Sequence, residues 1–253
     1  MQKIILENKK LTYAFEEEIK QLRTNLEFTG IDRKVILMTS SITSEGKSTL
    51  SLELAKSLAQ LGKNTLFLDA DMRMSSLVKT RVAGIPPKGL SQLLSGQCKI
   101  DEIVLETNTP NLFVITSGRI PPNPSELLAS SMMSKLIKWA RSNFDYVIID
   151  CPPLKPVSDS SIIAPYTDGA VLVVKAGFTS RKLAAESVRK LQQINCPILG
   201  VVINQVQQSK KIARKYGYDY YIHSEAGRKV ASHSSHSSSQ NLTQTETRLQ
   251  RKT

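Results

Sequence analysis

The amino-acid sequence predicts an α/β fold in which a mostly parallel β-sheet is flanked by helices. Three observations lead to this prediction. Short apolar runs alternate with helical patterns through the middle of the chain. The apolar runs are nearly continuous, as in strands that are covered on both faces. At 253 residues, 40% of them hydrophobic, the chain is long enough for one large α/β domain with appendages.

Six segments are the expected strands of a core domain that spans residues 31–207. They read KVILMTS (34–40), NTLFLDAD (64–71), NLFVITSG (111–118), DYVIIDCPP (145–153), GAVLVVKAG (169–177) and PILGVVINQV (197–206). A helix is expected after the first of them, because leucines recur there at helical spacing, at Leu50, Leu54, Leu58 and Leu61. Strands that alternate with helices indicate a parallel sheet.

The two ends of the chain differ from this core. Apolar residues at helical spacing, from Phe15 to Leu26, predict a helical arm over residues 1–30. Residues 208–253 lose the apolar periodicity and include SHSSHSSSQNLTQTET, which predicts a disordered tail. From Gln207 onward the chain has nine Lys and Arg residues and three acids. This excess of positive charge is half of the net charge of +12. Such a basic tail is either merely solvated or attracted to anionic lipid, nucleic acid or an acidic partner.

No segment of the sequence predicts export or a membrane span. No run approaches the roughly 18 apolar residues of a spanning helix, and MQKIILENKK lacks the apolar region of a signal peptide. We therefore expect a cytoplasmic location. Three cysteines lie far apart without metal-type spacing, and their odd number argues against a disulfide framework. We expect buried free thiols at Cys98, Cys151 and Cys196.

The stretch SSITSEGKSTL, residues 40–50, is close to the phosphate-binding pattern G-x-x-x-x-G-K-[ST]. Ser41 stands at the first glycine, where a small residue suffices for the turn. The stretch lies between a predicted strand and a predicted helix, and backbone N–H groups at a helix N-terminus bind phosphate. Lys47 would reach the terminal phosphates and Ser48 would ligate Mg²⁺. An ordinary strand–turn–helix is the alternative. The candidate nucleotide-binding residues of the loop are Ser44, Glu45, Gly46, Lys47, Ser48 and Thr49.

Acidic residues end two of the expected strands. LFLDADMR carries Asp69, Asp71 and Arg73, and VIIDCPP carries Asp150. In open α/β sheets, ligands bind at the carboxyl ends of the strands, so these carboxylates should meet the Mg²⁺ beside the phosphates. A single strand-end aspartate more often caps the segment that follows it. Three of them beside a GKST loop favour a functional site.

These motifs resemble the Walker A, A′ and B motifs of the bacterial P-loop tyrosine kinases, the cytoplasmic kinases of capsular and exopolysaccharide biosynthesis. The resemblance covers most of the chain and includes EEEIKQLRTNLEF, GLSQLLSG, SGRIPPNPSELL and LGVVINQV. It implies a P-loop NTPase-like fold, and a single-domain protein-tyrosine kinase that uses ATP and Mg²⁺. Phosphoryl transfer of this kind depends mainly on positioning and charge neutralisation.

The resemblance also suggests roles for individual residues. Lys47 would neutralise charge on the phosphates, and Asp69 would accept or orient the proton of the tyrosine. Arg73 would contact phosphate or a neighbouring subunit, and Asn204, at a strand end, would contact adenine. The expected catalytic residues are Lys47, Asp69, Asp71 and Asp150, and the expected metal ligands are Ser48, Asp71 and Asp150.

The tail contains a tyrosine cluster, YGYDYY, with four of the seven tyrosines of the chain: Tyr216, Tyr218, Tyr220 and Tyr221. A short strand or a partner-binding motif is the structural alternative. In the resembling family, such a cluster is the autophosphorylation site, and one subunit's tail enters the site of its neighbour in a ring.

The ring uses an E-x-x-R-x-x-R motif, which here reads Glu17, Lys20 and Arg23. Lys20 replaces an arginine, and lysine cannot form the planar bidentate pair.

The family resemblance further implies a partner and a location. A transmembrane chain-length regulator would stimulate the kinase and hold it at the inner face of the plasma membrane. Other proteins of the sugar-polymer pathway would be exogenous substrates, and no specific nucleic acid is expected. One departure lies in the loop, because the family usually has Pro-Gly where this chain has Thr43-Ser44. Losing that glycine reduces the conformational freedom of the loop.

Two other functions are compatible with the motifs. A partition or positioning ATPase would share the fold, but its signature places a lysine early in the loop, where this chain has Ile42. A non-catalytic scaffold that only binds nucleotide is the other alternative. Phosphotyrosine in the tail would distinguish the kinase from both.

Overall fold

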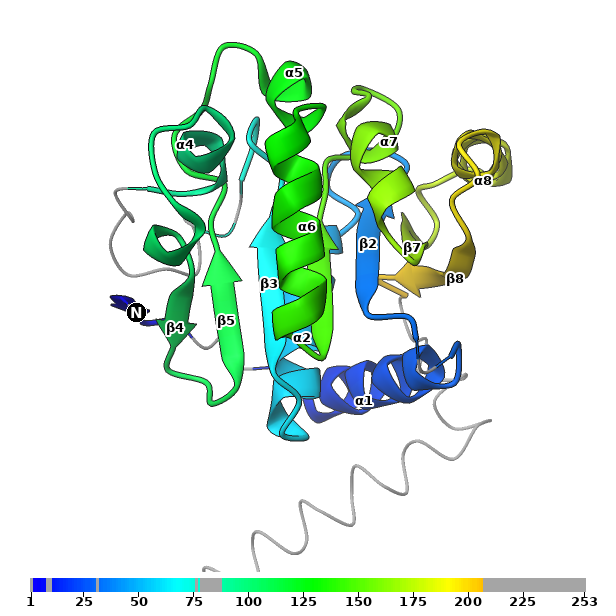
Figure 1. The fold of residues 1–253 in the computed structure, drawn as a ribbon. Helices are drawn as coiled ribbons and strands as arrows, with labels where there is room; N and C mark the ends of the chain where they lie inside the picture. Colours follow the sequence, from blue (N-terminus) through cyan, green and yellow to red (C-terminus); the bar gives the residue numbers. More distant parts are fainter. Residues whose placement is uncertain (1, 8–10, 31, 76, 78–87, 207–253) are drawn as a thin grey trace, which may run out of the picture. The chain divides into compact units, whose positions relative to one another are not determined.

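One eight-stranded sheet runs through the protein in the order β1-β4-β5-β3-β6-β2-β7-β8 (Figure 1). The computed structural model describes residues 2–7, 11–30, 32–75, 77 and 88–206. The predicted tail, 208–253, lies outside these residues. The strands are β1 (Gln2–Ile4), β2 (Val35–Ser40), β3 (Thr65–Asp69), β4 (Leu105–Thr107), β5 (Leu112–Ile115), β6 (Tyr146–Asp150), β7 (Gly169–Lys175) and β8 (Ile198–Asn204).

The sheet is mostly parallel, as predicted. Among the strand pairs of the described residues, only β4 and β5 run antiparallel. All six expected strands are present as β2, β3 and β5 to β8. Strands β1 and β4 were not predicted, because each has only three residues and no extended apolar run. Since β2, β3 and β6 are parallel neighbours, their carboxyl ends reach the same edge of the sheet.

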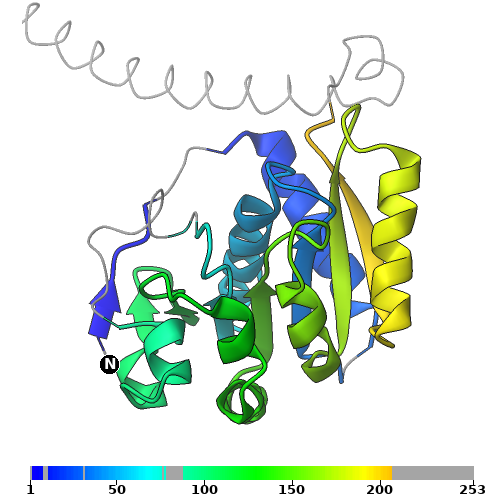
Figure 2. The ribbon, with the colours of Figure 1, turned by 90° about the horizontal axis from the view of Figure 1, so that it is seen from above.

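Helices cover both faces of the sheet (Figure 2). They are α1 (Tyr13–Glu27), α2 (Lys47–Gln60), α4 (Leu90–Leu94), α5 (Pro124–Leu128), α6 (Ser131–Asn143), α7 (Asp159–Ile163) and α8 (Arg181–Gln193), with short 3₁₀ turns at Ile100–Glu102 and Ala164–Tyr166. Alternate residues of β2 enter opposite cores: Val35 and Leu37 pack towards α6, whereas Ile36 and Met38 pack towards α2. Every residue of β2 and β3 is buried, which explains their continuous apolar sequences.

The first thirty residues belong to the same compact unit as the rest of the described chain, which spans Met1–Val206. The predicted helix is present as α1, and the Thr12 side chain caps it by accepting a hydrogen bond from the backbone N–H of Phe15 at 3.3 Å. Ile19 and Leu26 are buried in the core that α2 shares with the sheet. Helix α1 is therefore a layer of this unit. Its predicted role in an oligomer contact stays a prediction.

Two further expectations concern the whole chain. Cys98, Cys151 and Cys196 are free, and Cys151 and Cys196 are also buried, as predicted. Cys98 is only partly buried, so the prediction of its burial was wrong. Over the ranges that the structure describes, no helix combines the length and the apolar character of a membrane span.

Candidate active site

The phosphate loop lies where the sequence predicts it, between β2 and α2. Gly46 is the N-cap of α2 and has a left-handed backbone with φ 83°. A side chain has no room there, because an added Cβ would lie 2.2 Å from Asn204 Nδ2. Gly46 also offers no side chain to cap the helix, so the backbone donors at its N-terminus have no local side-chain partner. This arrangement, together with the helix dipole, fits an anionic phosphate group.

The unusual residues of the loop differ in their backbone requirements. Ser41, at the first glycine of the pattern, is fully buried and accepts a hydrogen bond from the Ser187 hydroxyl at 2.9 Å. Its backbone is not left-handed, so no glycine is needed there. Ser44 is different, because its φ of 65° lies in the left-handed region. It occupies the position at which the resembling family usually has glycine.

Glu45 builds the loop with its side chain. Its Oε2 accepts a hydrogen bond from the backbone N–H of Ile42 at 2.9 Å, and its Oε1 accepts one from the Thr179 hydroxyl after β7. The side-chain amide of Asn204 donates to the Glu45 carbonyl at 2.8 Å. The carboxylate and the backbone carbonyl of Glu45 are therefore used inside the protein, which leaves its backbone N–H for the predicted nucleotide contact. The end of β8 lies against the loop, and the predicted adenine contact of Asn204 stays a prediction.

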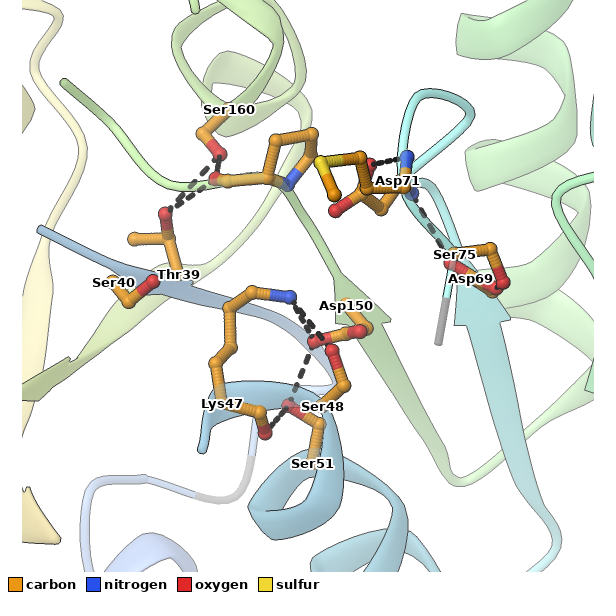
Figure 3. Close-up of polar contacts among 12 residues, drawn as sticks. Thr39, Ser40, Lys47, Ser48, Ser51, Asp69, Asp71, Ser75, Asp150 and Ser160 are labelled. Carbon is orange, nitrogen blue, oxygen red and sulfur yellow. Dashed lines mark hydrogen bonds and ion pairs between the residues drawn. The ribbon is translucent and has the colours of Figure 1, made fainter. Parts of the chain in front are cut away.

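A buried ion pair joins the loop to the end of β6 (Figure 3). Lys47 Nζ lies 2.6 Å from Asp150 Oδ1, and the two side chains are 7% and 4% exposed. Lys47 Nζ is also 3.1 Å from the Ser48 hydroxyl. Ser51, which the sequence reasoning missed, donates to Asp150 Oδ1 at 3.1 Å. It lies one helical turn after Lys47, so the four-residue spacing was the available signal.

Asp69 lies beside Asp150, because the two residues are register partners on β3 and β6. Burial, and after it the charge of the neighbouring Asp150, raises the pKa of Asp69 to about 7. The Ser75 hydroxyl donates to Asp69 Oδ2 and opposes the increase. A carboxyl group whose pKa lies near neutral pH suits proton transfer better than an ordinary aspartate.

Asp71 has a different environment from Asp69. Its Oδ1 accepts hydrogen bonds from the backbone N–H groups of Arg73 at 3.2 Å and Met74 at 2.9 Å. The carboxylate thereby caps the turn that follows β3, which was the structural alternative for a strand-end aspartate. Asp71 still lies at the same edge of the sheet as Asp69 and Asp150 (Figure 3).

Arg73 is engaged away from the phosphate loop. Its Nε lies 2.8 Å from Asp159 Oδ2 and its Nη2 lies 3.1 Å from Asp159 Oδ1. Nη2 also donates to the Ser125 hydroxyl at 2.8 Å, and Ser125 donates to Asp159 Oδ1 at 2.7 Å. Arg73 thus connects the end of β3 to α5 and α7. Its predicted phosphate or subunit contact stays a prediction. Asp159 is fully buried and was missed, although an acid in the first turn of a helix is a recognisable signal.

The oxygen donors at this edge fit a magnesium–nucleotide complex better than a metal ion alone. Across the described ranges, no three His, Cys, Asp or Glu residues lie close enough to form a metal site by themselves. Ser48, Asp71 and Asp150 offer one hydroxyl and two carboxylates. Mg²⁺ is typically held by one or two carboxylates, substrate phosphates and water. The donor set therefore has the chemistry that such a complex needs.

The other predicted site residues lie elsewhere. In α1, Lys20 Nζ lies 2.6 Å from Glu17 Oε1 on the exposed side of the helix. Arg23 instead donates through Nη1 to the backbone carbonyl and the hydroxyl of Ser57 on α2, at 3.1 Å and 2.9 Å. The three residues of the predicted oligomer motif therefore do not form one outward-facing group. The four tail tyrosines lie outside the described residues.

Comparisons with known proteins agree with this geometry. A family model described as an AAA domain matches residues 33–212. The tyrosine-protein kinase CpsD of Streptococcus agalactiae is 42% identical over 202 residues, which cover 80% of this chain and 88% of the relative. The tyrosine-protein kinase YwqD of Bacillus subtilis is 38% identical, over 81% of this chain and 85% of the relative. Among solved structures, the kinase domain of the Escherichia coli tyrosine kinase ETK matches with a TM-score of 0.70 and 31% identity, over 77% of this chain and 78% of that one.

Proposed function

The chain belongs to the family of bacterial P-loop tyrosine kinases, and we propose that it transfers a phosphoryl group from MgATP to the tyrosine cluster in the tail of a neighbouring copy. The observation that carries the proposal is the convergence of the loop lysine with the aspartates of two adjacent strands. Lys47 contacts Asp150, and Asp150 is the register partner of Asp69. The proposed acceptors are Tyr216, Tyr218, Tyr220 and Tyr221.

The residues of the site divide the work of binding and proton transfer. The N-terminus of α2 binds phosphate through its backbone N–H groups, and Lys47 neutralises phosphate charge. Ser48, Asp71 and Asp150 supply the oxygen ligands for Mg²⁺. When bound, MgATP supplies the transferable phosphoryl group and the divalent charge that neutralises its oxygens.

Asp69 takes the proton of the acceptor tyrosine. A tyrosine hydroxyl has an ordinary pKa of about 10, so it arrives protonated at neutral pH. The raised pKa of Asp69, about 7, lessens the mismatch with the phenol compared with an ordinary aspartate. The carboxylate form, which accepts the proton, predominates above that pH.

The kinase acts in capsular or exopolysaccharide synthesis at the inner face of the plasma membrane. A transmembrane chain-length regulator holds and stimulates it there, and proteins of the sugar-polymer pathway are its exogenous substrates. Copies assemble into a ring with the help of Glu17, Lys20 and Arg23, for which Arg23 would have to exchange its contacts with Ser57 for contacts with a neighbour. Each phosphate adds about −1.5 to −2 charge to the tail, so phosphorylation repels tails from the site and loosens the ring.

A phosphotyrosine blot of the purified full chain with MgATP tests the kinase activity, with an activator fragment added if needed. We expect signal on the tail of the wild type and none on Lys47→Met. Lys63→Met is the matched control, because Lys63 is exposed beyond the end of α2, and it should keep the signal. Changing all four tail tyrosines to phenylalanine should remove it.

Other outcomes would assign the chain to the alternative classes. Nucleotide-dependent dimers with DNA- or lipid-stimulated hydrolysis and no phosphotyrosine would indicate a positioning ATPase. ATP binding without turnover, even with a partner, would indicate a scaffold. A tail free of phosphate in cells that carry an intact Lys47 would contradict the proposal.

A further inference from the structure

Within the part of the chain that the structure describes, the side chain of Asp69 forms its hydrogen bonds with its own loop. Its Oδ1 accepts from the backbone N–H of Asp71 at 3.2 Å, and its Oδ2 accepts from the Ser75 hydroxyl. The residue is 1% exposed. Both oxygens of the proposed proton acceptor are therefore engaged (Figure 3), and the residue that carries them is buried.

The turn after β3 brings Ser75 back to Asp69. The Asp71 carboxylate caps this turn by accepting hydrogen bonds from the backbone N–H groups of Arg73 and Met74. The bidentate contact between Arg73 and the buried Asp159 fixes the middle of the turn. Ser75 is itself partly exposed, whereas Asp69 is buried. The hydroxyl is thus presented to Asp69 by an anchored loop.

We propose that Ser75 holds the place of the acceptor hydroxyl in the free enzyme, and that the phenol of the bound tyrosine displaces it from Asp69. This inference rests on the proposed function, in which Asp69 takes the tyrosine proton. In the free enzyme and in the tyrosine-bound enzyme alike, an O–H group donates a hydrogen bond to Asp69 Oδ2. A phenol can replace the serine hydroxyl there because each donates one hydrogen bond.

The exchange has two consequences for the acceptor. The displaced hydrogen bond is made to a carboxylate, so the tyrosine gains little from its own bond to Asp69 while Ser75 competes. A side chain without a hydroxyl cannot satisfy Asp69, and because an unsatisfied buried acceptor is unfavourable, such a side chain leaves Ser75 in place. Ser75 is in this sense a positioning residue that specifically weakens the binding of a hydroxyl-bearing acceptor.

Steady-state kinetics test the competition directly. The enzyme is the full chain with Tyr216→Phe, Tyr218→Phe, Tyr220→Phe and Tyr221→Phe, and the acceptor is a synthetic peptide of residues 212–223. We expect Ser75→Ala to lower the KM for the peptide by about five- to tenfold, the size of one lost competing hydrogen bond. The value of kcat should change less than KM, and Ser75→Thr should restore the wild-type KM.

Two further variants guard against a folding defect. Ser75→Cys keeps the size of the side chain but has only a weak donor, so it should behave as Ser75→Ala does. Ser142→Ala, an exposed serine on α6, is the matched control and should leave KM unchanged. A KM for the peptide that is unchanged or higher in both Ser75→Ala and Ser75→Cys would overturn the inference.

Peptide binding provides a readout that needs no phosphoryl transfer. Fluorescence anisotropy would compare the labelled peptide with a version in which all its tyrosines are phenylalanine. We expect Ser75→Ala to bind the tyrosine peptide more tightly than the wild type does, without a gain for the phenylalanine peptide. An equal increase in affinity for both peptides, or no increase for either, would contradict the role of Ser75. A tyrosine-selective gain in an enzyme that transfers no phosphate would support Ser75 and refute the kinase proposal.

Discussion

Ser44 adopts a backbone conformation that serine seldom takes. Its φ is 65°, and residues with a Cβ adopt this left-handed region at a cost of about 1 kcal/mol. The neighbouring Gly46 is also left-handed, at φ 83°, but has no Cβ. The loop therefore carries strain at one of its two left-handed positions.

The substitution Ser44→Gly should stabilise the protein by about 0.5–1 kcal/mol, because relief of strain outweighs the greater freedom of glycine in the unfolded chain. Urea unfolding measures the change. Ser142→Gly is the matched control, since Ser142 lies on the exposed side of α6, and it should destabilise by a similar amount. Destabilisation by both substitutions would show that Ser44 is not strained.

Asp69 should make the stability of the metal-free protein depend on pH. Its pKa is about 7 in the folded protein against the ordinary 3.8, so between these values the folded state holds a proton that the unfolded chain has released. The free energy of unfolding therefore falls as pH rises from about 4 to 7, by about 4 kcal/mol at most.

Urea unfolding in EDTA at pH 5 and pH 8 measures this effect, with Asp69→Asn as the comparison. The variant cannot ionise, so its stability relative to the wild type should be greater at pH 8 than at pH 5. A difference between the two proteins that stays constant over this range would show that Asp69 titrates normally.

At the scale of elements, α1 contributes to the core through one face. Ile19 and Leu26 are 4% exposed, and Arg23 donates to Ser57 on α2. The opposite face presents Glu17 and Lys20 to solvent. A helix arranged in this way stabilises its own domain and still has a polar face available to a partner.

Leu26→Ala should lower the free energy of unfolding by about 2–4 kcal/mol, because it leaves a cavity in the core that α1 shares with α2. Asn25→Ala is the control, since Asn25 is exposed on the same helix and its change should stay within about 0.5 kcal/mol. Denaturant unfolding of the full chain measures both. A loss below about 1 kcal/mol for Leu26→Ala would show that α1 packs only loosely.

The sequence predicted the elements that have strong local signals. The six longer strands carry apolar runs, and the loop before α2 carries a recognisable pattern. Strand β1 pairs in parallel with β4, whose antiparallel pairing with β5 departs from the rest of the sheet. Three residues are too few for a periodic pattern, so neither strand could be distinguished from a loop.

Contacts between distant residues limited the prediction of the site. Lys47 and Asp150 each belong to a motif with a local signature, and these motifs predicted one common site but not the ion pair between the two residues. The contacts of Glu45 with Thr179 and of Arg73 with Asp159 join residues 134 and 86 positions apart. A lone threonine or aspartate has no signature of its own, so these partners became visible only in the folded chain.

At the scale of the whole molecule, nucleotide binding should stabilise the protein as a unit. MgATP at a hundredfold excess over its Kd should raise the free energy of unfolding by about 2.7 kcal/mol, which corresponds to roughly 5–10 °C in Tm for a domain of this size. Lys47→Met should lose most of the increase, Lys63→Met should keep it, and EDTA should reduce it in the wild type. An equal increase for both lysine variants would place the nucleotide elsewhere.

The contacts that hold the phosphate loop also set the order in which this enzyme can mature during synthesis. Ser41 and Glu45 leave the ribosome early, whereas their partners Ser187, Thr179 and Asn204 follow 146, 134 and 159 residues later. At about 5–20 residues per second, the loop waits roughly 7–30 seconds for them. A nascent chain that stops before Thr179 should therefore lack nucleotide affinity, which makes ATP binding a late step that only an almost finished domain can take.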